Sequence, residues 1–458
     1  MKLSVGVLIV FCAAVPMAAQ STVPALTRHI EAAQKAQERQ DCATAAAEYT
    51  AAVRLLPTSG ELRTNQGIAL YCNHQFTDAV TVFQKALQLK PGLTVPHLFL
   101  GLSAFRLSNT ALAIRELEMA VRMMPADTNG NLWLGYAYLA DHRHEDAIER
   151  FNAVIADQPG NVDARYALGQ AYFESGRSKV RQLQTLAPHG RGIKLLVMQE
   201  KALQGGTTAD AANVLVEWQS SQEEQLYREA SEAEKNARAA LQIVLDEAPD
   251  SDRAHEILGE TFSLQRNNEA AIREYRMVLQ KNPALPGVRL ALANCLMQTS
   301  QFRDALTVLI EEQEIQPRSG DVWASTGKVQ LALGKDQDAL KSLQHALALP
   351  DHSPEALLLM GKTLLRLGEA KSAVPILEQA LRDGADSSTT NYFLARAYRS
   401  TGDRMAMTKA LQSYQRTSRD AAERQEALAL TVGPKDVRAG MTEQEEHDAS
   451  IMPTPEQH

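Results

Sequence analysis

Aromatic residues are scarce in this 458-residue chain: they make up 5% of it, although apolar residues together reach 45%. The core must therefore consist mostly of alanine and leucine, which suits closely packed helices. An excess of positive charge is also missing, since the formal net charge is −8, and this argues against a general nucleic-acid binder. Beyond the N-terminus, no apolar stretch reaches the roughly 20 residues of a membrane-spanning helix. The chain is too long for one hydrophobic core, so it should contain several domains or an array of repeats.

Catalytic signatures are also missing. The sequence has no glycine-rich phosphate loop, no Gly-x-Ser-x-Gly elbow and no carboxylate pair distinct from helix-surface charge. His142, His144 and Glu145 fall at an expected turn between helices, where a solvated loop is favoured over a metal site. His255-Glu256 lacks the second histidine of a zinc peptidase motif. We therefore predict no enzymatic activity, no cofactor and no metal site.

The N-terminus has the pattern of a secretory signal peptide. A short basic start, Met1-Lys2, precedes an apolar run over 3–15 and small residues up to Ala19. The pattern predicts cleavage after residue 19 or 20 and a periplasmic or secreted mature chain with no transmembrane segment. Cys12 raises the alternative of lipidation, but the bulky Phe11 before it disfavours that alternative.

Internal repeats dominate the rest of the chain. Prolines recur 34 residues apart, at Pro57, Pro91, Pro125 and Pro159, then at Pro249, Pro283 and Pro317, with Pro350 one residue early. Small residues keep the same phase at Gly67, Gly101, Gly135 and Gly169, then Gly259, Ala293, Gly327, Gly361 and Ala395. An alanine series runs Ala45, Ala79, Ala113, Ala147, Ala237, Ala271, Ala305, Ala339 and Ala373. Four residues after each alanine stands a large apolar residue: Tyr49, Phe83, Leu117, Phe151, Leu241, Tyr275, Leu309, Leu343 and Leu377.

This spacing predicts two antiparallel helices in each 34-residue repeat. The small residues lie where the two helices touch, the large residue fills the space beside that contact, and the proline ends the second helix. These residues resemble the tetratricopeptide repeat pattern, of which Leu134-Gly135, Tyr138, Ala147, Phe151 and Pro159 form one near-complete copy. Trp323 occupies the tryptophan position of that pattern once. The resemblance covers roughly residues 26–421 and implies an all-α, right-handed superhelical solenoid.

The repeats form two blocks in the same phase. Registered on the prolines, they cover 26–59, 60–93, 94–127, 128–161, 252–285, 286–319, 320–353, 354–387 and 388–421. A further repeat starts at 162 and is expected to break off at Gly176, with its second helix reappearing near 237–244. The predicted organisation is a signal peptide (1–20), an N-terminal block (21–176), an irregular helical insertion (177–231), a C-terminal block (232–421) and a capping helix with an acidic tail (422–458). In the last repeat Met407 replaces the alanine, as is common in terminal repeats.

The insertion separates its charges. Its first part carries only cations, Arg177, Lys179, Arg181, Arg191 and Lys194, whereas 217–234 is mostly acidic. One interpretation is a degenerate extra repeat with solvated faces. The other is an elbow whose basic patch binds an acidic partner or pairs with the acidic helix that follows.

The cysteines allow one disulfide. Cys42 is expected early in the second helix of the first repeat, and Cys72 at the end of the next helix, so both lie at the same end of neighbouring repeats. An oxidising compartment would permit a bridge between them, the alternative being two half-buried thiols. Cys295, mid-helix among apolar neighbours, is expected to be a small core residue.

The resemblance implies that first helices line a concave surface where partners bind. The inward positions of the third and fourth repeats are expected to be Leu98, Phe99, Leu102, Phe105, Leu132, Trp133, Tyr136 and Leu139. Such an apolar stripe could hold an amphipathic helix or an extended peptide, or its residues could pack against neighbouring repeats. The Lys/Asn pattern with which some relatives bind a C-terminal carboxylate is absent at these positions. We therefore predict an exported scaffold that binds other proteins or peptides, possibly in assembly of a cell-envelope complex. The alternatives are an accessory subunit of an enzyme and a solenoid that binds glycan or lipid.

Overall fold

The computed structural model describes residues 23–188, 190–203, 218–349 and 352–428, in which all regular secondary structure is α-helical. The predicted signal peptide lies outside these residues, apart from its boundary with α1. By their contacts, residues divide into two compact units, Met1–Glu174 (unit 1) and Ser175–His458 (unit 2). No helix within the described part of the chain is both long and apolar enough to cross a bilayer.

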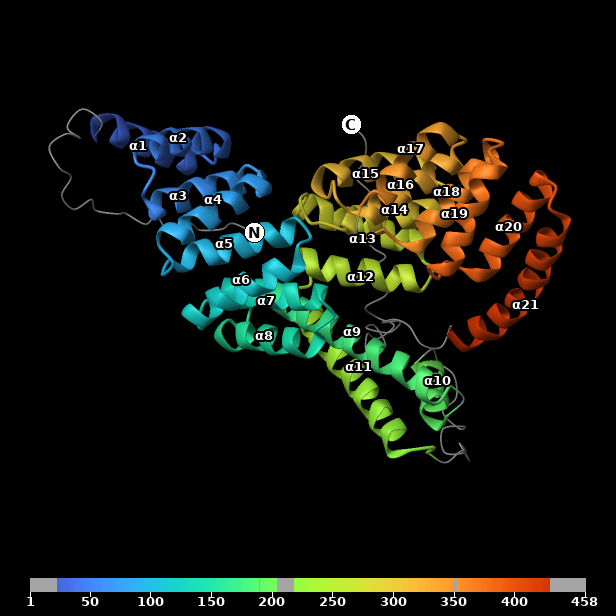
Figure 1. Cartoon of the computed structure of the whole chain (residues 1–458). Coiled ribbons are helices and arrows are strands. Elements are labelled where there is room, and N and C mark those ends of the chain that lie inside the picture. The colour runs from blue at the N-terminus through green and yellow to red at the C-terminus, as the bar shows by residue number, and fades with distance from the viewer. Residues whose placement is uncertain (1–22, 189, 204–217, 350–351, 429–458) are drawn as a thin grey trace, which may run out of the picture. The chain divides into compact units, whose positions relative to one another are not determined.

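Unit 1 consists of consecutive helix pairs (Figure 1). Its helices are α1 Val23–Glu38, α2 Cys42–Leu55, α3 Gly60–Cys72, α4 Phe76–Leu89, α5 Thr94–Arg106, α6 Thr110–Met123, α7 Thr128–Ala140, α8 His144–Asp157 and the start of α9 Val162–Leu186. Side chains cap several of these helices: the Asp127 carboxylate, for example, accepts a hydrogen bond from the Gly130 N–H at 2.8 Å. The expected helix–turn–helix fold is confirmed, and each helix contacts the next.

The alanine and large-residue series explain this packing. All nine predicted alanines have no exposed surface, and the nine large residues that follow them are at most 3% exposed. A glycine of the first helix faces each large residue in six repeats; a Cβ on Gly135 would lie 2.5 Å from Phe151 Cε1. That distance is closer than two carbons can approach, so only glycine lets this ring lie against the helix backbone.

The turn inside each repeat has one residue with positive φ. Nine turns share this feature, at Gln40, His74, Ser108, His142, Arg266, Ser300, Gly334, Gly368 and Gly402. A single left-handed residue reverses the chain between the two helices, and this is the place of His142, which we expected at a turn. The 34-residue spacing of these positions passed unnoticed in the sequence because the first six are not glycine.

Unit 2 continues the helix pairs after a modified repeat. Its helices after α9 are α10 Arg191–Leu203, α11 Ser221–Glu247, α12 Asp252–Leu264, α13 Asn268–Lys281, α14 Val288–Gln298, α15 Phe302–Ile315, α16 Gly320–Ala332, α17 Asp336–Leu347, α18 Pro354–Arg366, α19 Ala370–Arg382, α20 Ser387–Thr401 and α21 Arg404–Leu428. Met407 of α21 packs, partly buried, against the core formed by α18–α20.

The expectation that the helix breaks off at Gly176 was wrong. Helix α9 continues through this residue to Leu186, and α11 runs unbroken from Ser221 to Glu247, so 237–244 is the end of a long helix. Gly176 is buried inside α9, where an added Cβ would lie 3.4 Å from the Ala233 Cβ. This glycine therefore permits a close helix–helix contact and does not end the helix.

Candidate functional site

The predicted apolar stripe lies on α5 and α7 of unit 1, and burial divides its residues into two groups. Phe99, Leu102 and Leu132 are only 9%, 3% and 4% exposed, so they belong to the core and cannot serve as a binding surface. The other predicted residues, Leu98, Phe105, Trp133, Tyr136 and Leu139, are half-buried. Only this second group can contact a ligand while it stays packed in the fold.

Three of these half-buried residues form a chain of ring contacts. The Phe105 and Trp133 ring centroids lie 5.7 Å apart in an edge contact, and Trp133 and Tyr136 lie 5.6 Å apart. Tyr136 then contacts the fully buried Phe151 ring at 5.4 Å. Because each ring is held by the next, their exposed edges present a preformed apolar surface.

Tyr71 of α3 belongs to the same surface and was missed in the sequence. It stands 34 residues before Phe105, at the same position of its repeat, and is half-buried. Its ring makes edge contacts with Phe76 at 5.4 Å and with Phe99 at 5.6 Å, and burial raises its pKa. The repeat register could have found it. We call Tyr71, Leu98, Phe105, Trp133 and Tyr136 the aromatic stripe.

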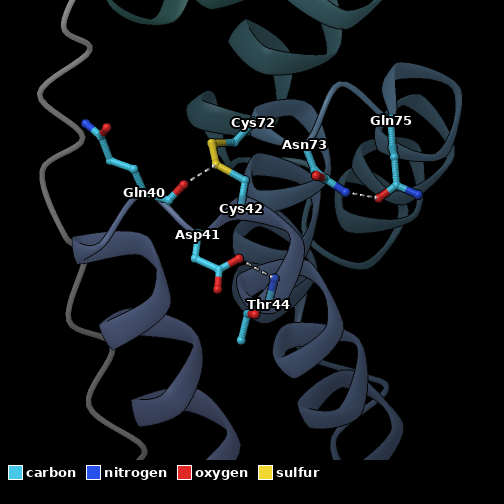
Figure 2. Close-up of a disulfide and its surroundings, with 7 residues drawn as sticks. All are labelled: Gln40, Asp41, Cys42, Thr44, Cys72, Asn73 and Gln75. Atoms are coloured by element: carbon cyan, nitrogen blue, oxygen red, sulfur yellow. Dashed lines mark hydrogen bonds between the residues drawn. A yellow bond between two sulfur atoms is a disulfide. The ribbon is translucent and has the colours of Figure 1, made fainter.

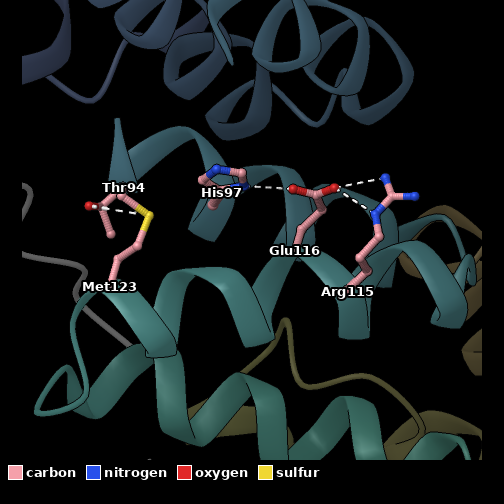
Figure 3. Close-up of polar contacts among 5 residues, drawn as sticks. All are labelled: Thr94, His97, Arg115, Glu116 and Met123. Atoms are coloured by element: carbon pink, nitrogen blue, oxygen red, sulfur yellow. Dashed lines mark hydrogen bonds and ion pairs between the residues drawn. The ribbon is translucent and has the colours of Figure 1, made fainter. Parts of the chain in front are cut away.

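Beside the stripe, a polar network joins the two helices of the third repeat (Figure 3). His97 Nδ1 of α5 lies 2.7 Å from the Glu116 Oε2 of α6, and Arg115 donates to Glu116 Oε1 from Nε and Nη2 at 2.9 and 2.7 Å. The Glu116 side chain is only 9% exposed, so these contacts satisfy a carboxylate that would otherwise be costly to bury.

The residue at the fourth position of a repeat has this role throughout. His29 and His255 lie 2.6 and 2.7 Å from the carboxylates of Glu48 and Glu274 in the same way as His97. In other repeats the fourth residue donates to the carbonyl of the preceding repeat's proline: Arg63, Asn131, Arg165, Arg289 and Trp323 do so at 2.6–3.1 Å. These side chains hold the repeats together, and His255 makes such a structural contact. His144 is buried at the start of α8, and no group of three metal-binding side chains occurs among the residues that the structure describes.

A disulfide joins the first two repeats (Figure 2). The structure links Cys42, the first residue of α2, to Cys72, the last residue of α3, with a Cα–Cα distance of 5.6 Å across 30 residues. Cys72 is exposed and Cys42 is half-buried. The other described cysteine, Cys295, is a free thiol 1% exposed, and burial raises its pKa.

The inserted region of unit 2 has a small core and a buried carboxylate. Leu183, Leu196 and Leu226 pack α9, α10 and α11 together. Glu223 of α11 is fully buried, and its carboxylate accepts hydrogen bonds from the Gly192 N–H at 2.9 Å and the Gln219 N–H at 2.6 Å. The carboxylate thereby caps the N-terminus of α10.

The charges of this region are partly paired inside the region. Lys179 of α9 lies 3.0 Å from the Glu229 carboxylate of α11, and the Arg191 guanidinium lies 5.2 Å from the Trp218 ring centroid. Of the two roles that we gave the basic patch, the pairing of α9 with the acidic helix α11 therefore has a direct contact in its support.

Replacing Glu223 by glutamine should loosen this region. The amide has lost its charge, and its NH2 group cannot accept the second backbone hydrogen bond, so local opening of α10 should become easier by about 1.5–3 kcal/mol. Amide hydrogen exchange along α10 measures the change. The matched control is E232Q, which changes an exposed glutamate of the same helix and should leave exchange unaltered. Equal exchange in both variants would show that the carboxylate does not hold α10.

Comparison with known proteins finds the same repeat throughout the chain. Two family models, each described as Tetratricopeptide repeat, match residues 30–94, 98–150, 228–286 and 358–423, and residues 138–179 and 264–328, respectively. The first of these sets alone covers more than half of the chain. Tetratricopeptide repeat protein 8 of Caenorhabditis elegans is 30% identical over 133 residues, which are 28% of this chain and 26% of that relative.

Among solved structures, the human IFIT1 dimer with PPP-AAAA is 16% identical and has a TM-score of 0.42, with 88% of this chain and 85% of that chain covered. YrrB, described as a TPR protein with an unusual peptide-binding site, is 23% identical with a TM-score of 0.31, over 34% of this chain and 80% of that chain. The family assignment rests on the repeat matches and not on these scores.

Proposed function

Because the chain belongs to the tetratricopeptide repeat family, we propose that it is an interaction scaffold that binds a partner protein on the aromatic stripe of unit 1. The observation that carries this proposal is the row of half-buried rings across α5 and α7, whose inner edges are fixed by the core. Rigid, partly exposed aromatic side chains bind at low entropic cost and dominate the energetics of protein interfaces.

The proposed partner segment is an amphipathic helix or an extended peptide with apolar anchors. The stripe offers apolar contact area, while the neighbouring Glu116 is already satisfied by His97 and Arg115. We further propose that the protein acts after export, in a cell-envelope complex. Support for export comes from the N-terminal pattern and from a disulfide that an oxidising compartment would preserve.

Replacing Trp133 by alanine should abolish or strongly weaken capture of the partner. Loss of a central interface tryptophan costs about 2–4 kcal/mol of binding, which is about 30-fold to 1,000-fold in Kd. The measurement is pulldown from cell-envelope extract with quantitative mass spectrometry, followed by titration with the recovered partner.

The matched control is Trp323→Ala in unit 2. This second tryptophan stacks on His345 at 4.0 Å and donates to the Pro317 carbonyl, so its loss removes a similar ring from a structural position. Trp133→Ala with an unchanged set of captured proteins would exclude the stripe as the binding surface. Capture of glycan or lipid with no protein would instead favour a solenoid that binds small molecules.

A further inference from the structure

The last three repeats carry a second surface of different chemistry. The ninth residue of the first helix is a cation in each of them: Lys328 in α16, Lys362 in α18 and Arg396 in α20. Helix α18 contacts both α16 and α20, so the three cations follow one another across a single face of first helices. At the corresponding position unit 1 has Leu102 and Tyr136, which makes the two faces chemically distinct.

Two of these cations converge on one aromatic ring without a carboxylate between them. Lys362 Nζ lies 5.9 Å from the Phe393 ring centroid and Arg396 Cζ lies 5.8 Å from it, while Arg396 also lies 5.9 Å from the Tyr392 ring centroid. Arg399 is exposed one turn further along α20. We call Lys362, Arg396 and Arg399 the basic cluster.

The lack of counter-charge at this cluster differs from the rest of unit 2. Lys328 is paired with Glu355 at 2.8 Å, Arg366 with Asp336 at 2.9 Å, and Arg289 with Glu311 at 2.9 Å. For the three cations of the basic cluster, no ion pair with a carboxylate occurs within the described ranges. Like charges that are held together repel each other, and an anionic ligand removes that repulsion.

We propose that the basic cluster binds an acidic segment of a partner protein, whose side-chain carboxylates pair with Lys362, Arg396 and Arg399. Guanidinium groups form bidentate, charge-assisted hydrogen bonds with carboxylates, and the exposed Tyr392 ring supplies apolar contact area at 42% exposure. A polyphosphate chain fits this surface less well, because Glu355 and Asp403 are exposed at its borders and the whole chain carries a net charge of −8. This surface would act independently of the aromatic stripe.

The test is a fluorescence anisotropy titration of the full chain with a labelled (Glu-Ser)6 peptide at low salt. Neutralising two cations of the cluster in K362Q/R396Q should weaken binding about tenfold. The matched control, K341Q/K371Q, removes the same charge from exposed lysines of the second helices α17 and α19 and should bind like the wild type. The charge-reversed variant K362E/R396E should bind a labelled (Lys-Ser)6 peptide more tightly than the wild type does.

Four results would overturn the proposal. Equal weakening by both neutralised pairs would show an effect of net charge alone, and failure of K362E/R396E to gain affinity for the basic peptide would show that the cluster does not touch it. Tighter binding of a single-stranded oligothymidylate than of the acidic peptide would assign the surface to nucleic acid. A large rise in peptide affinity in E443Q/E445Q/E446Q/D448N would assign the cluster to the chain's own acidic residues. Trp133→Ala should leave every one of these titrations unchanged, so failure of the stripe and failure of the cluster are distinguishable.

Discussion

Replacing Phe151 by alanine should lower the free energy of unfolding of unit 1 by about 3–5 kcal/mol. The ring has no exposed surface, faces the backbone of α7 at Gly135 and supports Tyr136 of the aromatic stripe. Its loss leaves a cavity that the glycine cannot fill. Urea unfolding followed by circular dichroism measures the change. The control is Leu89→Ala, at a side chain 44% exposed, which should cost under about 1 kcal/mol.

A companion variant tests the same contact from the other side. Gly135→Ala should cost about 1–3 kcal/mol, because its Cβ would lie 2.5 Å from Phe151 Cε1. Adding Phe151→Leu to it should cost less than the sum of the single changes, since the repeat with Ala293 and Leu309 already holds that combination. Strict additivity would contradict the proposed contact, as would equal effects of Phe151→Ala and Leu89→Ala.

Removing the disulfide with C42S/C72S should destabilise the first two repeats by about 3–4 kcal/mol. The bridge closes a loop of 30 residues, and in the chain-entropy model such a loop restricts the unfolded chain by about that amount. Thermal unfolding with and without reductant measures the effect. Reductant should lower the Tm of the wild type and leave that of the double variant unchanged.

Counting thiols tests the bridge itself. A chain cleaved after the signal contains Cys42, Cys72 and Cys295, so in denaturant without reductant it should show one free thiol. Three free thiols would exclude the disulfide and weaken the case for export. In the folded chain Cys295 should react slowly, because it is buried and its raised pKa keeps it protonated.

The sequence was most informative where chemistry repeats at fixed spacing. Ala147 and Phe151 could be placed in the core because their counterparts recur every 34 residues, and no other fold explains that period as well. Burial of individual stripe residues could not be predicted in the same way. Phe99 and Leu98 are adjacent apolar residues of α5, and only the packing of the neighbouring helices makes one core and leaves the other half-exposed.

Two other features escaped sequence analysis for physical reasons. Gly176 was interpreted as a helix end because glycine often follows a helix, whereas here it permits contact with Ala233 inside α9. The basic cluster was invisible because Lys362 and Arg396 look like ordinary surface charges. Only the structure shows that both lie near the Phe393 ring and that neither has a carboxylate partner among the described residues.

The left-handed turns have a consequence for engineering. A residue other than glycine in this conformation costs backbone energy, and six of the nine turns carry such a residue, Gln40 and His142 among them. The later turns at Gly334, Gly368 and Gly402 show that the same reversal can be made with glycine. The first six turns thus hold an unused reserve of stability, which glycine substitutions could release one repeat at a time without touching either binding face.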